Sequence, residues 1–338
     1  MSVVRLRSVP DVSVGRAIHH PGGTLQSRAV QLGLRVSARP VIQAWSHTPF
    51  LPWPYELADQ VGRLLPRVHG TEITDIDLPD CPGHVVRNSS HDRGRVIVYF
   101  QGGAFLVGGR HMHRHMISRI AQQSGASVIV PRFRKLPNHP VTSSIADGLA
   151  AYRHALDEGH DPADIALMGD SAGGYLTFMV TLAARREGLP VPGAITAMSP
   201  LIELDPLRRN MSPSGCTLFN QRAFRAFATL IATAHRRDGG RGPGMHSPSA
   251  GELAGLPPTL IQCSATESLY DDAARMTAAL AAAGVDVELQ VWDKQVHVFQ
   301  AAAGLVPEAT HAVSEVMSFL DRHVPGSARI GTRSSSVG

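Results

Sequence analysis

The residues best suited to chemistry form one short segment, Gly169-Asp170-Ser171-Ala172-Gly173-Gly174, in which a serine stands among very small side chains. An apolar run precedes this segment, and an amphipathic stretch begins at Ala172. A strand that turns sharply into a helix exposes a serine for nucleophilic attack, and only small residues fit around so tight a turn. The following helix N-terminus favours negative charge that develops beside the serine. We therefore expect Ser171 to be a nucleophile, although a glycine-rich turn without chemistry has the same composition.

A second glycine-rich segment, Gln101-Gly102-Gly103-Ala104-Phe105, directly follows the apolar run 95–100. Acyl transfer needs backbone N–H groups that bind the oxyanion of a tetrahedral intermediate. A loop of this kind at a strand end can supply such donors, with another from Ala172. An ordinary flexible loop has the same pattern, and it is the serine motif further along the chain that favours the functional interpretation.

A histidine base is expected after the last strand, because sites of this type follow the chain order serine, acid, histidine. The chain has 17 histidines, so position decides among them. His297 follows the final apolar run, 287–292. We therefore predict that His297 is the base.

The acid is expected after the preceding apolar run, 258–264. Glu267 is the first carboxylate beyond it. Asp271 and Asp272 fall in the first turn of the next expected helix, where acidic side chains commonly serve the helix dipole. We expect those two to point to solvent or to cap that helix, and we assign the acid to Glu267.

Apolar runs that alternate with amphipathic stretches must position these residues. The runs are 95–100, 126–131, 164–169, 194–199, 258–264 and 287–292, and the stretches lie near 113–123, 144–157, 172–186, 269–284 and 308–323. A strand pair is also expected at 72–77 and 84–87, around a turn at 80–83. The alternation predicts an α/β fold with a mostly parallel central sheet, helices on both of its faces and a cap.

The domain organisation follows from where this alternation holds. Residues 1–70 are predicted to form an N-terminal cap region, and 71–324 the main domain. Within it, 203–255 breaks the alternation, holds one helix near 221–235 and is a possible cap insertion. The tail 325–338 is expected to be disordered.

Aromatic and apolar residues gather among three prolines between positions 45 and 55. They are Trp45, Phe50, Leu51, Trp53 and Tyr55. The prolines exclude a regular helix or a central strand through this segment. Two interpretations remain open: the cluster lines an acyl pocket, or it is a loop that packs on the core.

These segments together resemble the bacterial hormone-sensitive lipase family of α/β-hydrolase esterases over about residues 70–323. The motifs that carry the resemblance are QGGAF at 101–105, FRKLPNHP at 133–140, GDSAGG at 169–174, ESLYD at 267–271 and HVF at 297–299. The resemblance implies an α/β-hydrolase fold and no metal or organic cofactor. It also implies that the backbone N–H groups of Gly103, Ala104 and Ala172 bind the oxyanion, while Gly102 supports the turn.

Three departures from the family pattern stand out. Gln101 replaces the histidine that opens the oxyanion motif, and glutamine can also form hydrogen bonds. Glu267 replaces an aspartate, and its longer stem must still reach Nδ1 of His297. The segment 133–140, which is mainly structural in the family, differs at Lys135, Leu136 and Asn138.

Two other segments mimic functional motifs. His111 and His115 stand four residues apart, as a metal-binding pair would, but no third ligand is evident and a solvated helix start is the simpler interpretation. Asp205-Pro206-Leu207-Arg208 spells the family's acid motif but comes one strand too early. We interpret it as a turn that enters the insertion.

Composition limits the partners. The net charge is only +4, and the charged residues are scattered, so a nucleic acid is not expected. The three cysteines lie far apart, which favours a reducing compartment. No apolar stretch has the length of a signal peptide or of a membrane span, so we predict a cytoplasmic protein without an integral span. A small-molecule ester is the expected partner, and a homodimer stays possible.

The predicted function is hydrolysis of short- to medium-chain carboxylic esters through a Ser171–His297–Glu267 triad. The proline-stiffened segment 45–55 and the lack of a secretion signal favour small esters over work at an oil–water interface. An acyltransferase or amidase with the same triad is one alternative. A non-catalytic receptor for small molecules is another, although such a receptor has no need of the serine or the histidine.

Overall fold

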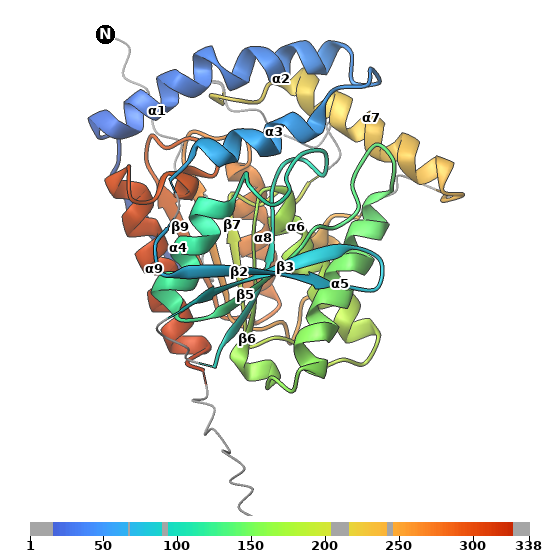
Figure 1. Cartoon of the computed structure of the whole chain (residues 1–338), viewed down its shortest axis with the longest axis vertical. Helices are drawn as coiled ribbons and strands as arrows, with labels where there is room; N and C mark the ends of the chain where they lie inside the picture. Colours follow the sequence, from blue (N-terminus) through green and yellow to red (C-terminus); the bar gives the residue numbers. More distant parts are fainter. Residues whose placement is uncertain (1–15, 67, 90–93, 204–215, 242–245, 327–338) are drawn as a thin grey trace, which may run out of the picture.

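The computed structural model of the chain describes residues 16–66, 68–89, 94–203, 216–241 and 246–326. A central sheet runs through these ranges (Figure 1). Its strands are β1 (Arg16–His20), β2 (Thr71–Asp77), β3 (Pro82–Asn88), β4 (Val96–Phe100), β5 (Ser127–Pro131), β6 (Ile165–Asp170), β7 (Ala194–Met198), β8 (Thr259–Ser264) and β9 (Val287–Trp292). Short 3-10 turns lie at Gly62–Leu64, Pro162–Asp164, Pro248–Ala250 and Phe299–Ala302.

The strand order is β1-β9-β8-β7-β6-β4-β5-β3-β2. All neighbouring pairs are parallel except β2–β3 and β3–β5. The expected mostly parallel sheet is therefore confirmed, and so is the strand pair around the turn at 80–83. The parallel strands place the ends of β4, β6, β7, β8 and β9 at one edge, where the loops with the candidate site residues begin.

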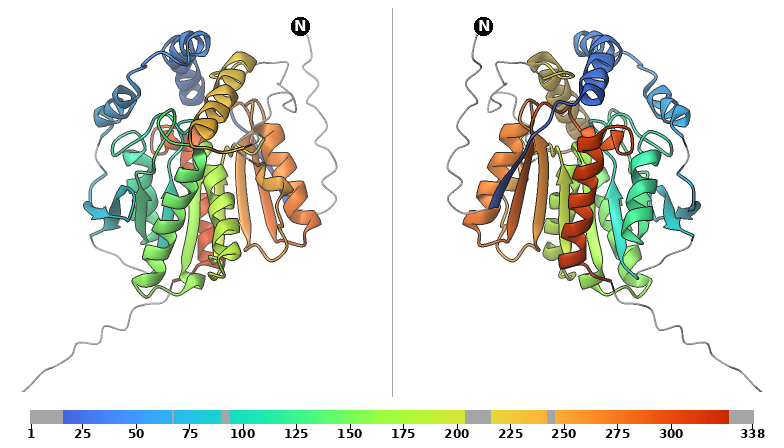
Figure 2. Two further views of the ribbon diagram at one scale, coloured as in Figure 1. Left: turned by 90° about the vertical axis from the view of Figure 1, so that its right-hand side faces the viewer. Right: turned by 90° about the vertical axis from the view of Figure 1, so that its left-hand side faces the viewer.

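Helices cover both faces of the sheet (Figure 2). On one face lie α4 (Arg114–Ser124) and α9 (Pro307–His323), and on the other α5 (Val141–Asp157), α6 (Ala172–Arg186) and α8 (Tyr270–Ala282). Successive side chains of a strand point to opposite faces. In β4, accordingly, Val98 and Phe100 enter the core under α5 and α6, while Ile97 and Tyr99 enter the core under α4 and α9.

The chain enters the sheet through a strand that the sequence did not predict. β1 pairs in parallel with β9, and the ring of His20 stacks on Trp292 with centroids 3.9 Å apart. The Glu308 carboxylate, in the first turn of α9, accepts the N–H groups of Gly23 and Thr24 at 2.8 and 2.9 Å. These contacts fix the position of the residues that directly precede the next helix.

Four helices lie beyond the carboxyl edge of the sheet (Figure 1). They are α1 (Leu25–Val36), α2 (Ala38–His47), α3 (Tyr55–Val61) and α7 (Gln221–Arg237). The weak periodicity of residues 1–40 predicted neither α1 nor the start of α2, because α1 carries apolar residues on two sides. Its N-terminus is capped by Thr24, whose Oγ1 accepts the N–H of Ser27 at 3.3 Å. Within the described ranges, none of the helices has the length and apolar character needed to cross a bilayer.

The aromatic segment divides between two environments. Trp45 and Tyr55 pack against the core, and the indole N–H of Trp45 donates to the Tyr55 hydroxyl at 3.0 Å. Phe50 and Leu51 are 60% and 57% exposed. The cluster is therefore neither one pocket wall nor one packed loop. Residues 205–208 and 327–338 lie outside the described residues, so the expectations for the entry turn and for most of the tail have no structural counterpart here.

Candidate active site

Ser171 occupies a sharp turn between β6 and α6. Its backbone has φ 52° and ψ −117°, a conformation that costs a non-glycine residue roughly 1–3 kcal/mol and is found mainly at functional sites. The turn brings α6 so close to β4 that a Cβ atom on Gly173 would lie 1.9 Å from the carbonyl oxygen of Phe100. Glycine is therefore required at position 173, and the serine is presented at the strand edge.

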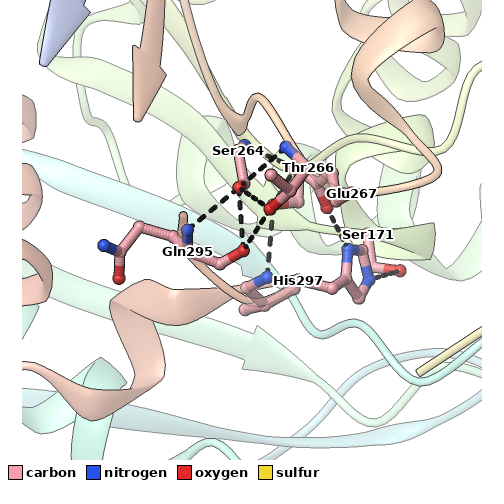
Figure 3. Close-up of polar contacts among 8 residues, drawn as sticks. Ser171, Ser264, Thr266, Glu267, Gln295 and His297 are labelled. Atoms are coloured by element: carbon pink, nitrogen blue, oxygen red, sulfur yellow. Dashed lines mark hydrogen bonds and ion pairs between the residues drawn. The ribbon is translucent and has the colours of Figure 1, made fainter. Parts of the chain in front are cut away.

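Three predicted residues meet at this turn (Figure 3). The Ser171 Oγ lies 2.9 Å from Nε2 of His297. The Nδ1 atom of the same ring lies 2.6 Å from Oε2 of Glu267. His297 and Glu267 are 9% and 2% exposed, so water has little access to the bond between them. A nucleophile, a base and an orienting carboxylate in this sequence form the geometry needed for covalent catalysis.

The second oxygen of Glu267 is also held. Its Oε1 atom accepts the Ser199 hydroxyl at 2.9 Å and the Ser264 N–H at 2.8 Å. A buried carboxylate is stable as an anion only when hydrogen bonds replace its lost water. These two donors leave Oε2 free to face the histidine and fix its direction.

A small polar cluster joins the acid loop to the base loop (Figure 3). The Ser264 hydroxyl donates to the carbonyl oxygen of Gln295 at 2.8 Å and accepts the Gln295 N–H at 3.2 Å. Thr266 Oγ1 donates to the same carbonyl at 3.1 Å. The loops after β8 and β9 are thus bound together two residues before His297.

Asp271 and Asp272 lie in the first turn of α8, as expected, but Asp272 does not point to solvent or cap its own helix. It is 2% exposed, and its Oδ2 accepts the N–H groups of Ile202 and Glu203 at 2.6 and 2.8 Å. The expectation for Asp272 was wrong because the chain leaving β7 passes close to α8 and donates two backbone N–H groups to this carboxylate. Asp272 therefore holds the segment after β7.

The loop after β4 has an unusual backbone. Gly103, Ala104 and Phe105 have φ values of 113°, 55° and 53°. In the part of the chain that the structure describes, the N–H groups of Gly103, Ala104 and Ala172 have no hydrogen-bond acceptor. Free N–H groups at a strand edge and at a helix N-terminus are suited to bind an oxyanion.

The segment 133–140 supports this loop from below. The Leu136 N–H donates to the carbonyl oxygen of Phe105 at 2.9 Å, and the rings of Phe105 and Phe133 pack edge to face. Arg134 is bonded to the buried Asp147 at 2.7 Å, which fixes the segment on α5. The departures at Lys135, Leu136 and Asn138 therefore leave a backbone contact in place.

Asp170 connects the serine turn to the same loop. Its carboxylate accepts the Gly102 N–H at 3.0 Å and the Tyr99 hydroxyl at 2.8 Å, and it lies 3.1 Å from Nε2 of His113. Burial by itself raises the pKa of this carboxyl, but His113, Tyr99 and Gly102 together hold the pKa below its usual value. The Gly102 N–H therefore donates to Asp170, which agrees with a role in supporting the turn.

Gln101 does not take over the contacts of a loop-ordering histidine. It is 1% exposed, and its Nε2 atom has no acceptor within the described residues. The loop is instead held from its next residue, through Gly102 and Asp170.

Aromatic side chains lie around the site. The Phe219 ring meets His297 edge to face with centroids 5.3 Å apart. Phe227 of α7 stacks on Phe105 of the oxyanion loop, with centroids 6.2 Å apart and nearly parallel rings. α7 and the segment before it therefore form an apolar wall over the nucleophile.

Comparisons with known proteins agree with this geometry. A family model described as the alpha/beta hydrolase fold matches residues 97–301. The chain is 34% identical over 293 residues to esterase LipU of Mycobacterium tuberculosis, which covers 84% of this chain and 98% of that protein. The chain belongs to the α/β-hydrolase family. It is also 32% identical over 338 residues to carboxylesterase/phospholipase LipF of the same organism, covering 94% of this chain and 90% of LipF.

Solved structures place the chain within a branch of that family. A mutant of the esterase E40 has a TM-score of 0.80 at 30% identity and covers 89% of this chain and all of its own. An esterase from the bacterial hormone-sensitive lipase family has a TM-score of 0.72 at 30% identity, covering 84% of this chain and 97% of its own. The resemblance inferred from the motifs is therefore confirmed: this is a bacterial α/β-hydrolase of the hormone-sensitive lipase family.

The two histidines with metal-like spacing are separated in this hydrolase. His115 lies 3.1 Å from the carbonyl oxygen of Pro66 and 3.2 Å from that of Ala303, while His111 faces a different environment. Among the described residues, no group of three or more His, Cys, Asp or Glu side chains could hold a metal ion.

Three residues near the site escaped the sequence argument: Asp170, His113 and Ser199. Asp170 stands inside the serine motif, at the last position of β6, so its placement could have suggested a role. His113 and Ser199 reach the site only through the path of the chain after β4 and β7, and no local pattern marks them.

Proposed function

We propose that this protein hydrolyses carboxylic esters with short or medium acyl chains through a covalent acyl-enzyme. The observation that carries the proposal is the continuous path from Ser171 Oγ through His297 to Glu267, with contacts of 2.9 and 2.6 Å. The path starts on a strained turn at a helix N-terminus. A receptor would gain nothing from that strain.

Each residue has one role in the proposed reaction. Ser171 Oγ attacks the acyl carbon while His297 Nε2 accepts the hydroxyl proton. Glu267 keeps the ring oriented and stabilises the imidazolium. The N–H groups of Gly103, Ala104 and Ala172 bind the oxyanion. His297 then protonates the leaving alcohol, and water, activated by the same ring, releases the acid.

The proposed chain-length limit rests on the wall above the nucleophile. Phe219 contacts the catalytic ring, and Phe227 stacks on the oxyanion loop. We expect these rings to contact a small acyl group and to exclude a long one. Hydrolysis and acyl transfer differ in the acceptor that attacks the acyl-enzyme, so product analysis with added alcohols and amines separates them.

The remaining proposals concern the setting. We propose a cap made of α1, α2, α3 and α7 over the main domain, a small ester as the partner of the site and a cytoplasmic location. The cysteines, Cys81, Cys216 and Cys263, are free and buried, which suits a reducing compartment. Cell fractionation tests the location, and sedimentation tests the homodimer that the sequence left possible.

The test of the activity is a series of p-nitrophenyl esters of increasing acyl length, with Ser171→Ala as the control. We expect turnover to fall for long acyl groups. Ser171→Ala should lower kcat by about 10⁴-fold or more, because the covalent route is lost. Folding should be unaffected, as checked by circular dichroism. If the variant keeps more than a few per cent of the activity, the nucleophile lies elsewhere.

A further inference from the structure

The outer surface of the cap is unusually apolar. In the described part of the chain, ten large apolar side chains are strongly exposed, and nine of them lie between residues 25 and 64. We call these nine residues the cap face: Leu25, Leu32, Val36, Val41, Phe50, Leu51, Leu57, Val61 and Leu64, each 57–84% exposed. Such a concentration on one region marks an interaction surface rather than the scattered apolar residues found on any protein.

The cap face follows the helical repeat. Leu25, Leu32 and Val36 stand at i, i+7 and i+11 and therefore on one side of α1. The other side of α1 is already used, because Val30 and Leu34 pack against the core. A helix with one packed apolar side and a second, exposed apolar side needs a partner for the second.

The same spacing recurs on α3 and the 3-10 turn that follows it. Leu57, Val61 and Leu64 stand at i, i+4 and i+7, and each is at least 62% exposed. α1 and α2 lie farthest from the sheet in this direction, and α3 lies below them (Figure 1). The cap face is therefore not covered by the body of the protein.

The charge around the cap face is strongly positive. Residues 25–64 and α7 contain eight arginines and two carboxylates, a net charge of +6, against +4 for the whole chain. Within the described residues, none of these eight arginines has an ion pair with a carboxylate: Arg28, Arg35, Arg39, Arg63, Arg222, Arg225, Arg236 and Arg237. Arginines of the main domain, such as Arg134 and Arg153, have carboxylate partners. The cap arginines are therefore available to anions from outside the chain.

A hollow between α2 and α7 brings both properties together. Its lining includes Pro49, Phe50 and Ala226 beside the guanidinium groups of Arg222 and Arg225. A hollow lined by apolar side chains together with two arginines suits a lipid whose headgroup is anionic. α7 also carries Phe227, which stacks on Phe105 of the oxyanion loop, so one helix borders both this hollow and that loop.

We propose that the cap face and its arginines bind an anionic lipid surface and hold the protein at the edge of a membrane. Helices with exposed apolar residues and flanking arginines bind in the plane of such an interface, with each basic residue adding about a fivefold gain in affinity. A second copy of the chain fits less well, because a symmetric dimer through this face would bring its own positive charges together.

The proposal departs from the sequence-based expectation that the protein avoids lipid–water interfaces. That expectation rested on residues 45–55 and on the lack of a secretion signal, whereas most of the cap face lies on α1 and on α3 with the turn after it, which the sequence pattern did not predict. Binding to lipid is also independent of the proposed hydrolysis. It can therefore fail or succeed without deciding the activity.

The test is flotation of the full chain with vesicles of phosphatidylcholine alone and of phosphatidylcholine with about 30% phosphatidylglycerol. We expect binding to the anionic vesicles that weakens as NaCl rises from about 50 to 500 mM, since salt screens the arginines. The charge variant Arg222→Gln/Arg225→Gln should bind about 30-fold more weakly. The apolar variant Leu32→Ser/Leu57→Ser should bind at least about tenfold more weakly.

Matched controls lie outside the cap. Leu305→Ser removes the tenth exposed apolar residue, and Arg186→Gln removes an exposed arginine at the far end of α6. Both should bind as the parent protein does, and all four variants should hydrolyse a soluble short ester at the parent rate. Absence of binding to either vesicle, or equal losses in the cap variants and the controls, overturns the proposal. So does a dimer that Leu32→Ser/Leu57→Ser converts to a monomer without any vesicle binding.

Discussion

The Oγ atom of Ser199 lies 2.9 Å from Oε1 of Glu267. The Ser199 Oγ atom also accepts the N–H of Val298, the neighbour of His297, at 3.2 Å. Ser199 follows β7, so a loop that carries no member of the triad touches both the acid and the residue next to the base. The relative position of Glu267 and His297 therefore depends on three strand ends rather than two.

Removal of this hydroxyl should weaken catalysis without abolishing it. In Ser199→Ala, Glu267 keeps the Ser264 N–H but loses one donor, and we expect kcat to fall about tenfold, equal to roughly 1.4 kcal/mol, with KM nearly unchanged. Thr196→Val is a matched control, since Thr196 lies in β7, just before Ser199, and its buried Oγ1 has no partner in the described structure. Equal kcat values in the two variants would show that Ser199 does not position the acid.

The identity of the acid is tested by three amide variants at saturating substrate. Glu267→Gln should preserve the fold and lower kcat by up to about 10⁴-fold, because the amide no longer fixes the histidine tautomer. Asp271→Asn should cost at most about tenfold through helix-end electrostatics. If Asp271→Asn is the crippled variant and Glu267→Gln is not, the acid has been misassigned.

Asp272→Asn should behave differently from both Glu267→Gln and Asp271→Asn. Its carboxylate accepts two backbone N–H groups from the segment after β7, so the variant should lose about 1–3 kcal/mol of stability while its kcat changes by at most about tenfold. Urea denaturation together with steady-state kinetics separates the two effects. A loss of kcat as large as that of Glu267→Gln, with unchanged stability, would contradict the structural role.

The main domain could be predicted from the sequence because each element carries its own signal. The buried parallel strands form continuous apolar runs, and the helices between them have one apolar side, so both periods are visible locally. β1 and α1 gave no such signal. β1 is a five-residue edge strand that exists through its pairing with β9, and α1 has two apolar sides. Both depend on contacts distant in sequence.

The candidate site divides in the same way. Ser171, Glu267 and His297 could be proposed because each follows a strand whose end lies at one edge of the sheet. The side chains of Ser199 and His113 reach the site from other loops. The spacing of residues along the chain does not reveal these contacts. The burial of Asp272 was missed because the path of residues 201–203 above α8 is decided by packing.

Asp170 should be needed to hold the oxyanion loop. Asp170→Asn keeps the shape but removes the charge that Tyr99, Gly102 and His113 surround, so we expect kcat to fall about 10- to 100-fold with a small change in KM. Tyr99→Phe removes one donor and leaves the Gly102 contact, and its kcat should fall less than about fivefold. Equal losses in both variants would indicate general destabilisation instead of a displaced loop.

His84 is buried in β3, with 1% of its surface exposed and no partner for Nδ1 in the described residues. Burial, and then the nearby Arg110 and Arg132, lowers its pKa from 6.5 to about 4, against smaller opposing effects of Asp75 and Asp59. The unfolded chain therefore binds a proton at pH 6.5 that the folded chain resists until about pH 4. The stabilising contribution is present above pH 6.5 and is lost as the pH falls toward 4.

This linkage predicts how stability changes with pH. Between pH 7 and pH 5, His84 should account for a loss of about 2 kcal/mol in the free energy of unfolding. The variant His84→Gln lacks this imidazole. The slope of its unfolding free energy against pH should therefore be flatter than that of the parent, whatever its absolute stability. Urea denaturation at half-unit pH steps measures both slopes, and parallel curves for the parent and His84→Gln would exclude His84 as the source.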